Sequence, residues 1–261
     1  MANYSWKHFL LSQLNKVLLI AGFRVSRYSV HIRRKDTKVF FDHNQPLTSD
    51  FLIRVLWDCD SFVDIGCNRG KFAEHVQKLR PELPWLIVEP IPYLMDQLMR
   101  KFNFRKDLTV FKQIALDDSS GSKIFYVTTN DGQSSSLLGL GQKHLEASPD
   151  TTVSDEIRVE TSTLDELGTS VPGKRVFMKI DVQGKELDVL QAGLYFLKNV
   201  YAIHIEVSMQ HLYDGDTLGY EIWKFLEDNG FILYGIDPWF RSAAHSGALI
   251  QADFFFVRLD S

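Results

Sequence analysis

Residues 63–70 read Val63-Asp64-Ile65-Gly66-Cys67-Asn68-Arg69-Gly70, and this stretch decides the fold. An apolar run ends here in a turn that contains two glycines, and a helical pattern follows from Lys71. Glycine allows the backbone to approach a ligand closely, and the first turn of a helix offers free N–H groups to an anion. The motif is not G-x-G-x-x-G, because Asn68 stands at the middle glycine. Taken alone, the turn also fits an ordinary strand-to-helix connection.

From residue 61 onward, strands alternate with helices. Apolar runs predict strands at 61–65, 85–89, 108–115, 175–181, 201–207, 231–235 and 253–258. Helical periodicity predicts helices at 71–79, 93–102, from about 185 and at 217–229. This alternation predicts an α/β fold whose sheet is covered by helices on both faces. Residues 123–127 and 157–160 are predicted as antiparallel additions, and we expect the long loop between them to act as a mobile lid.

The first 57 residues are predicted to form an N-terminal extension packed on a main domain of residues 58–261. Within the extension, Phe9 to Phe23 has the pattern of an amphipathic helix, with a membrane-surface helix or a dimer helix as the alternative. A homodimer therefore stays open. We expect no stable membrane insertion, because the stretch is short and is interrupted by Ser12, Gln13, Asn15 and Lys16.

Charge and cysteine usage exclude several classes of function. The 261 residues carry a formal net charge of -4 without a basic stripe, so no nucleic-acid partner is expected. The two cysteines, Cys59 and Cys67, have no metal-ligand spacing, so neither a disulfide framework nor a zinc site is indicated. This cysteine usage fits a cytoplasmic protein.

A second motif supports a ligand at the glycine turn. Glu89 ends the second predicted strand, roughly 20 residues beyond the turn, and Pro90 follows it. Nucleotide-binding α/β folds place an acid at this point on the ribose hydroxyls, because a carboxylate accepts two hydrogen bonds from a vicinal diol. The turn and Glu89 together predict a nucleotide-type cofactor.

The ordered set of motifs resembles the FkbM family of S-adenosylmethionine-dependent methyltransferases, over residues 60 to about 258. The further matching segments are Ala115-Leu116-Asp117-Asp118, Ser134-Ser135-Ser136-Leu137, Thr163-Leu164-Asp165-Glu166-Leu167, Met178-Lys179-Ile180-Asp181-Val182-Gln183-Gly184-Lys185-Glu186, Val189-Leu190-Gln191-Ala192-Gly193 and His204-Ile205-Glu206-Val207. The chain departs from the family at Gln183, where a Glu is usual. This departure removes a charge beside the expected reaction centre, and it puts in doubt a mechanism that needs an acid there.

The resemblance implies a Rossmann-like class I methyltransferase fold, with a mostly parallel seven-stranded sheet, an antiparallel edge strand and extra β hairpin elements. It also implies S-adenosylmethionine as the cofactor, and methylation of a hydroxyl on a small molecule, sugar or glycan. The cofactor residues that it implies are Asp64, Gly66, Asn68 and Gly70 for the methionine half, Glu89 and Pro90 for the ribose, Ala115 and Asp117 for the adenine, and Asp181.

An acceptor hydroxyl must lose its proton, which requires a general base or a metal. The catalytic candidates lie at the carboxyl ends of two predicted strands, where α/β folds bind ligands, and they are Lys179, Asp181, His204 and Glu206. Asp181 is the first choice as base, and the alternative is a divalent ion held by the two carboxylates. Trp239, Phe240 and His245 are expected in a late loop that either closes over the substrate or packs on the surface.

Two other functions compete with methyl transfer. An NAD-dependent oxidoreductase can use the same fold, but the missing middle glycine and the Asp181 segment argue against it. A non-catalytic nucleotide-binding module is the other alternative, and Gln183 is the feature that favours it.

Overall fold

The computed structural model of the chain describes residues 23–25, 30–32, 47–171, 173–242 and 246–259. The chain divides into two compact units, Met1–Gln45 and Pro46–Ser261. In the first unit, β1 (Phe23–Val25) pairs with β2 (Val30–Ile32) in antiparallel fashion. Apart from Phe23, the helix predicted for residues 9–23 lies outside the described residues.

The second unit contains a seven-stranded sheet in the order β11-β12-β10-β9-β3-β4-β5. The strands are β3 (Ser61–Ile65), β4 (Trp85–Val88), β5 (Thr109–Lys112), β9 (Val176–Ile180), β10 (Val200–Ser208), β11 (Phe231–Arg241) and β12 (Leu249–Arg258). All neighbouring pairs are parallel except those of β12, which is antiparallel to both β10 and β11. The mostly parallel seven-stranded α/β fold is thus confirmed.

The position of the antiparallel strand differs from the expectation. We expected it at the edge, but β12 lies between β10 and β11, and β11 forms the edge. The reason is that β11 and β12 form a hairpin whose second strand returns into the space beside β10. The apolar pattern of the two strands does not encode which of them inserts.

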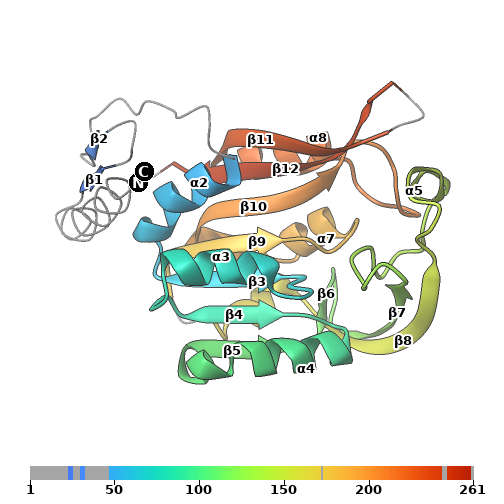
Figure 1. Cartoon of the computed structure of the whole chain (residues 1–261), viewed down its shortest axis with the longest axis horizontal. Helices are drawn as coiled ribbons and strands as arrows, with labels where there is room; N and C mark the ends of the chain where they lie inside the picture. Colours follow the sequence, from blue (N-terminus) through green and yellow to red (C-terminus); the bar gives the residue numbers. More distant parts are fainter. Residues whose placement is uncertain (1–22, 26–29, 33–46, 172, 243–245, 260–261) are drawn as a thin grey trace, which may run out of the picture. The chain divides into compact units, whose positions relative to one another are not determined.

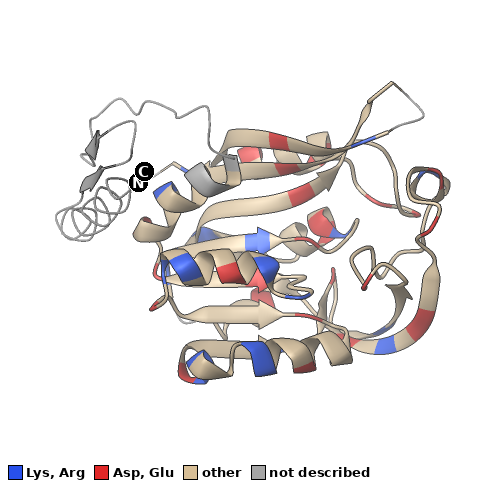
Figure 2. Cartoon of the chain, in the orientation of Figure 1, with Lys and Arg blue, Asp and Glu red and all other residues tan. Residues whose placement is uncertain are grey.

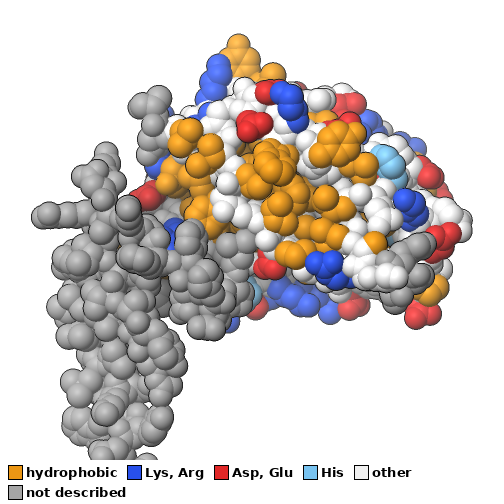
Figure 3. Space-filling view, turned by 90° about the horizontal axis from the view of Figure 1, so that it is seen from above, with side chains coloured by type: hydrophobic (Ala, Val, Ile, Leu, Met, Phe, Trp, Pro, Cys, Tyr) orange, Lys and Arg blue, Asp and Glu red, His pale blue; other side chains and the backbone are white. Residues whose placement is uncertain are grey.

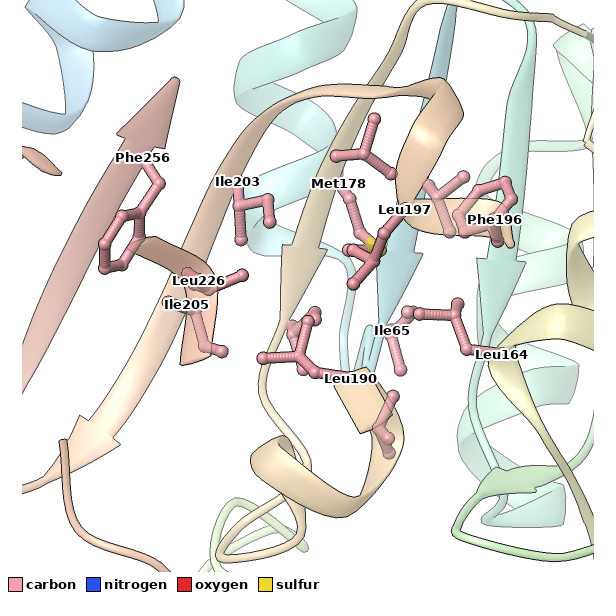
Figure 4. Packing of buried hydrophobic residues seen from close by; sticks show 14 of the residues in the cluster. Ile65, Leu164, Met178, Leu190, Phe196, Leu197, Ile203, Ile205, Leu226 and Phe256 are labelled. Atoms are coloured by element: carbon pink, nitrogen blue, oxygen red, sulfur yellow. The ribbon is translucent and has the colours of Figure 1, made fainter. Parts of the chain in front are cut away.

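Helices cover both faces of this sheet. On one face lie α2 (Leu47–Val55), the short turn η1 (Leu56–Asp58), α3 (Lys71–Leu79) and α4 (Pro92–Lys101), in front of the sheet in Figure 1. The other face carries α6 (Leu164–Gly168), α7 (Glu186–Gln191), η3 (Phe196–Asn199) and α8 (Gly219–Asp228). Figure 4 shows leucines of these helices meeting Ile65, Met178 and Ile203 of the sheet.

Helix α2 belongs to the core of the second unit. Its Phe51, Leu52 and Val55 are buried, and the Phe51 ring packs on the rings of Phe177 and Phe255. The second unit accordingly begins at Pro46 and includes α2, although we expected residues 1–57 to form a separate extension.

A small second sheet, β6-β8-β7, lies beside the main one. Its strands are β6 (Ala115–Leu116), β7 (Gly121–Thr128) and β8 (Val153–Ser162), and β7 and β8 form the predicted antiparallel addition. The strand predicted at 108–115 is in fact two strands, because the chain leaves β5 after Lys112 and η2 (Asn103–Leu108) precedes it. Ala115 then pairs with Thr161 of β8, a partner far away in sequence. The predicted long loop contains α5 (Gln142–Ala147).

The outer edge of the main sheet is partly apolar. Figure 3, which looks toward this edge, shows hydrophobic side chains gathered among charged ones. Along β11, Ile232, Ile236 and Trp239 are exposed by 45%, 38% and 52%. Trp239 and Phe240 belong to this strand rather than to a loop, and His245 lies outside the described residues.

Candidate active site

The glycine turn crosses directly over the end of β9. Gly66 has a φ of 73°, and its N–H donates to the Val88 carbonyl at 3.1 Å. A Cβ atom on Gly66 would lie 1.8 Å from the carbonyl oxygen of Asp181, which leaves no room for any side chain. Gly70 also has a positive φ, but a Cβ there would meet the side chains of Leu98 and Phe102. Gly66 is therefore needed for the crossing, and Gly70 for helix packing.

Glu89 is held in place by the turn. Its Oε2 accepts the Asn68 N–H at 2.8 Å, and its Oε1 accepts the Ile91 N–H at 3.0 Å. Burial raises the pKa of Glu89 to about 7, although these two N–H groups act in the opposite direction. Each oxygen keeps a lone pair for a further donor.

A narrow pocket, which we call the turn pocket, opens beside Glu89. Of the residues predicted to bind the cofactor, it is lined by Gly66, Asn68, Glu89, Pro90, Ala115 and Asp181. Its apolar wall consists of Ile65, Val88, Ile91, Ile114, Leu116, Phe125 and Leu137. Asp64, Gly70 and Asp117 do not line it. The Asp117 carboxylate is instead bound by the ammonium groups of Lys123 and Lys185.

The loop after β7 supplies a wall of the turn pocket that residue patterns did not assign. Gln133, Ser135 and Leu137 line it, although Ser134 to Leu137 was recognised only as a family segment without a role. The Arg69 guanidinium pairs with Asp131 at 2.7 Å and so ties this loop to the glycine turn. This ion pair joins residues that are 62 positions apart in the sequence, so no local sequence pattern predicts it.

Lys179 connects the predicted carboxylates beneath the turn. Its Nζ donates to the Gly66 carbonyl at 2.9 Å and to Asp181 Oδ2 at 3.0 Å, and it lies 3.8 Å from Asp64 Oδ1. Burial alone would lower the pKa of Lys179, but Asp181 and Asp64 raise it above its usual value. Lys179 therefore remains a cation at neutral pH, and its ammonium group holds Asp181 and the glycine turn together.

An amide joins the two candidate catalytic carboxylates. Gln183 Nε2 donates to Asp181 Oδ1 at 2.6 Å and to Glu206 Oε1 at 2.7 Å. Its Oε1 accepts the hydroxyl hydrogen of Tyr213. The two carboxylates thus lie on either side of one side chain, as their places at the ends of β9 and β10 predicted.

Glu206 has one carboxylate oxygen, Oε2, that accepts no hydrogen bond from the described residues. Its Oε1 accepts from Gln183 and, at 2.7 Å, from Gln251 Nε2 on β12. Burial, together with the nearby charges of Asp181 and Asp253, raises the pKa of Glu206 well above its usual value. Both oxygens of Asp181, in contrast, already accept hydrogen bonds from Gln183 and Lys179.

His204 is packed between aromatic rings, and Glu186 is bonded to backbone N–H groups. The His204 ring lies between the rings of Phe72 and Phe255, at centroid distances of 4.7 and 4.8 Å, and its Nε2 is 3.3 Å from Asp253 Oδ1. Glu186 is buried and accepts the N–H groups of Val182 and Gly184, each at 3.0 Å. It fixes the backbone that carries Gln183.

A second, larger space adjoins the turn pocket. This wide cavity, of about 1000 Å³, lies over the ends of β10 and β12 and beside α2 and α3. Gly66, Asn68, Gln133, Asp181 and Gln183 line both spaces, so the two meet at the paired carboxylates. Glu206, His204 and Asp253 line the wide cavity but not the turn pocket. Figure 2 shows acidic and basic positions on the central strands of the sheet.

Metal binding was the alternative use of the carboxylates. Within the described part of the chain, no group of three or more His, Cys, Asp or Glu side chains is arranged to hold a metal ion.

None of the described helices combines the length and apolar character needed to cross a membrane. Cys59 and Cys67 are both free and buried.

The buried acids make a pH effect on stability measurable. Burial raises the pKa of Glu89 and of Glu186 from 4.5 to about 7. Between these values the folded state binds more protons than the unfolded state, so stability should fall as the pH rises from about 5 to 8. Each group should contribute about 2–3 kcal/mol to that fall. Urea unfolding at constant ionic strength measures it, and Glu186→Gln should flatten the curve; stability that rises over this range would contradict the assignment.

Comparison with known proteins identifies a family. The model of the methyltransferase FkbM domain matches residues 64–233. The 2-O-methyltransferase NoeI of Sinorhizobium fredii is 28% identical over 159 residues, which are 59% of this chain and 65% of NoeI. The chain thus spans somewhat under two thirds of the length of this relative.

Solved structures resemble the chain at low sequence identity. The methyltransferase FkbM of Methylobacillus flagellatus KT superposes with a TM-score of 0.46 at 11% identity, covering 75% of this chain and 44% of that one. The magnesium protoporphyrin IX methyltransferase of Synechocystis PCC 6803 gives a TM-score of 0.44 at 11% identity, covering 81% and 78%. Because the FkbM domain match extends over more than half of the chain, the protein belongs to the FkbM family of methyltransferases.

Proposed function

We propose that the protein transfers the methyl group of S-adenosylmethionine to a hydroxyl oxygen of a small molecule or glycan. The observation that carries this proposal is the meeting of the turn pocket and the wide cavity at Asp181 and Gln183, with Glu206 beside them. The former fits a cofactor and the latter an acceptor. NoeI, a relative named as a 2-O-methyltransferase, supports oxygen as the methylated atom.

The residues of the turn pocket fit the cofactor. Gly66 leaves the backbone bare where the methionine half would lie, and Glu89 presents free lone pairs to the two ribose hydroxyls. The apolar wall with Leu116, Phe125 and Leu137 suits the adenine ring. The cofactor supplies a methyl group on a sulfonium that is already a good leaving group, so the protein mainly positions the acceptor and removes its proton.

Glu206 is the group that we assign to proton removal. It lies in the wide cavity, its raised pKa makes it more basic than an ordinary carboxylate, and its Oε2 makes no hydrogen bond with the described residues. Lys179 and Asp181 hold the glycine turn and the Gln183 amide in place, and neither of them accepts the proton. His204 positions Asp253 on the floor of the cavity.

Neither alternative function gains support. The family is one of methyltransferases, which leaves the oxidoreductase without a basis. Gln183 favoured a non-catalytic module, but its amide bridges Asp181 and Glu206 and so keeps both in a fixed arrangement. A cytoplasmic location and a homodimer stay predictions.

Replacing Glu89 with alanine tests the cofactor site. The change removes an acceptor of charge-assisted hydrogen bonds, which should weaken the binding of S-adenosylmethionine by about 1.5–3 kcal/mol, or roughly 10- to 150-fold. Calorimetric titration of the purified protein measures it. Glu82→Ala, a solvent-exposed acid outside both spaces, is the control. Unchanged affinity in Glu89→Ala would remove the ribose assignment.

The transfer itself is tested with S-adenosylmethionine that carries a trideuterated methyl group. Incubation with hydroxylated acceptors should give methyl ethers whose mass contains the label. Label found only on nitrogen or carbon atoms would refute oxygen as the acceptor atom.

A further inference from the structure

A bulge in β11 turns two consecutive aromatic rings toward the wide cavity. Pro238 lies opposite Ala252 and Phe240 opposite Gln251, so Trp239 is an extra residue without a partner on β12. Successive side chains of a regular strand point to opposite faces. Here both Trp239 and Phe240 line the wide cavity, and their rings stack at 5.6 Å with an angle of 21° between them. Bulges next to active sites commonly redirect a side chain in this way.

The rings face a polar floor. Gln251, which lies opposite Phe240 in the ladder, lines the same cavity together with Glu206 and Asp253. Trp239 keeps 52% of its surface exposed, so its ring face is free to pack on a ligand. A sugar ring has an apolar C–H face and a rim of hydroxyls, and this combination of an aromatic surface with carboxylates and an amide suits both.

A row of basic side chains forms another wall. Lys71, His75 and Lys78 line the wide cavity from α3, and their spacing of four and three residues puts them on one face of that helix. All three are exposed. None of them forms an ion pair with a described residue, whereas the neighbouring Arg69 and Lys101 do.

We propose that the acceptor is an acidic saccharide, one of whose rings stacks on Trp239 and Phe240 while an anionic substituent binds to Lys71, His75 and Lys78. This inference rests on the proposed function and adds the class of acceptor to it. The aromatic pair selects a sugar, the basic row selects a carboxylate, sulfate or phosphate on it, and Glu206 lies on the floor between these walls.

A single-stranded nucleic acid also combines stacking with anion binding, but the cavity suits it less. A chain of phosphates would place charges over Asp181, Glu206 and Asp253 on the floor, whereas the single anionic substituent of the proposed saccharide lies at the basic wall; the formal net charge of the protein is -4. Trp239 and Phe240 stack on each other, so the pair leaves no slot between its rings for successive bases.

The test compares acceptors that differ only in charge. A saccharide with a single galacturonate residue, its carboxyl-reduced neutral counterpart, a sulfated and a phosphorylated form of that counterpart, and a mixed-sequence oligonucleotide are each incubated with labelled S-adenosylmethionine. Mass spectrometry then quantifies labelled methyl ethers. We expect at least one acidic saccharide to be methylated 10-fold or more faster than the neutral one. The arm that responds identifies the anion.

Variants connect the preference to the walls. The double variant Lys71→Ala/Lys78→Ala should reduce the acidic-to-neutral rate ratio to about one, and Trp239→Ala should raise the KM for the acidic saccharide about 10-fold. Lys106→Ala and Tyr220→Ala, exposed residues outside the cavity, are the matched controls and should leave both values unchanged.

Four results would overturn the proposal. They are equal rates on the acidic and neutral saccharides, a rate ratio that the double lysine variant leaves intact, methylation of the oligonucleotide in place of every saccharide, and no methylation of any saccharide. Calorimetric binding of S-adenosylmethionine separates this failure from that of the proposed function. If S-adenosylmethionine binds but no saccharide is methylated, only the acceptor class is refuted. If S-adenosylmethionine does not bind, both the acceptor class and the proposed function are refuted.

Discussion

Replacement of Glu206 by glutamine should lower the turnover of methyl transfer by about 100-fold or more and change the affinity for S-adenosylmethionine little. The amide oxygen of glutamine can still accept from Gln183 and Gln251, so the local structure should survive. What is lost is the ability to take the acceptor proton. Because burial and the nearby acids raise the pKa of Glu206, the wild-type rate should increase with pH until this carboxylate is ionised, since only the ionised form is a base.

Single-turnover transfer measured from pH 6 to 9 checks both parts. The glutamine variant should lose the increase of rate with pH as well as the rate itself. Asp181→Asn should slow the reaction but keep the increase, because Asp181 positions other groups and does not accept the proton. If Asp181→Asn abolished the increase and Glu206→Gln kept it, the two roles would have to be exchanged.

Gly66→Ala should destabilise the protein by about 3–5 kcal/mol and abolish measurable cofactor binding. The new methyl group would lie 1.8 Å from the Asp181 carbonyl oxygen. Neither backbone segment can yield, because the Asp181 N–H, directly after β9, donates to the Ile65 carbonyl and the Gly66 N–H donates to the Val88 carbonyl of β4. Relief of the clash would have to move the turn away from Lys179, whose Nζ holds the Gly66 carbonyl. Urea unfolding and calorimetry measure the two effects.

Gly215→Ala is the matched control for this variant. Gly215 has a φ of 84° with nothing within 4 Å of the new Cβ, so it bears the cost of a positive φ without the clash. That cost should be about 1 kcal/mol. Equal losses in the two variants would mean that the close crossing of the turn over β9 contributes nothing.

Much of the fold was predictable because the apolar runs and helical periods are local signals. Residues 61–65 and 71–79 agree with β3 and α3 to the residue. The division of 108–115 was not predictable, since Ala115 leaves the main sheet for a partner, Thr161, that only the folded chain brings near. The position of β12 inside the sheet likewise depends on a long-range pairing with β10.

The candidate site divides in the same way. An acidic residue at the end of an apolar run is visible in the sequence, so Glu89, Asp181 and Glu206 could be identified from sequence patterns alone. The partners of these groups could not be named. Gln251 reaches Glu206 from a strand 45 positions later. The Lys185 ammonium forms an ion pair with Asp117, a residue that the family resemblance assigned to the adenine, and no sequence periodicity predicts such a pair.

The late insertion of β12 also governs when the site can exist during synthesis. Chains emerge from the ribosome N-terminal end first, and β3, β4, β5, β9 and β10 are complete well before residues 249–258. Until then, one side of β10 stays unpaired and Glu206 lacks the Gln251 amide. A nascent chain stalled before residue 249 would hold the glycine turn and Glu89 but not the full floor of the wide cavity. The acceptor side of the site thus depends on β12, whereas no residue that lines the turn pocket belongs to that strand.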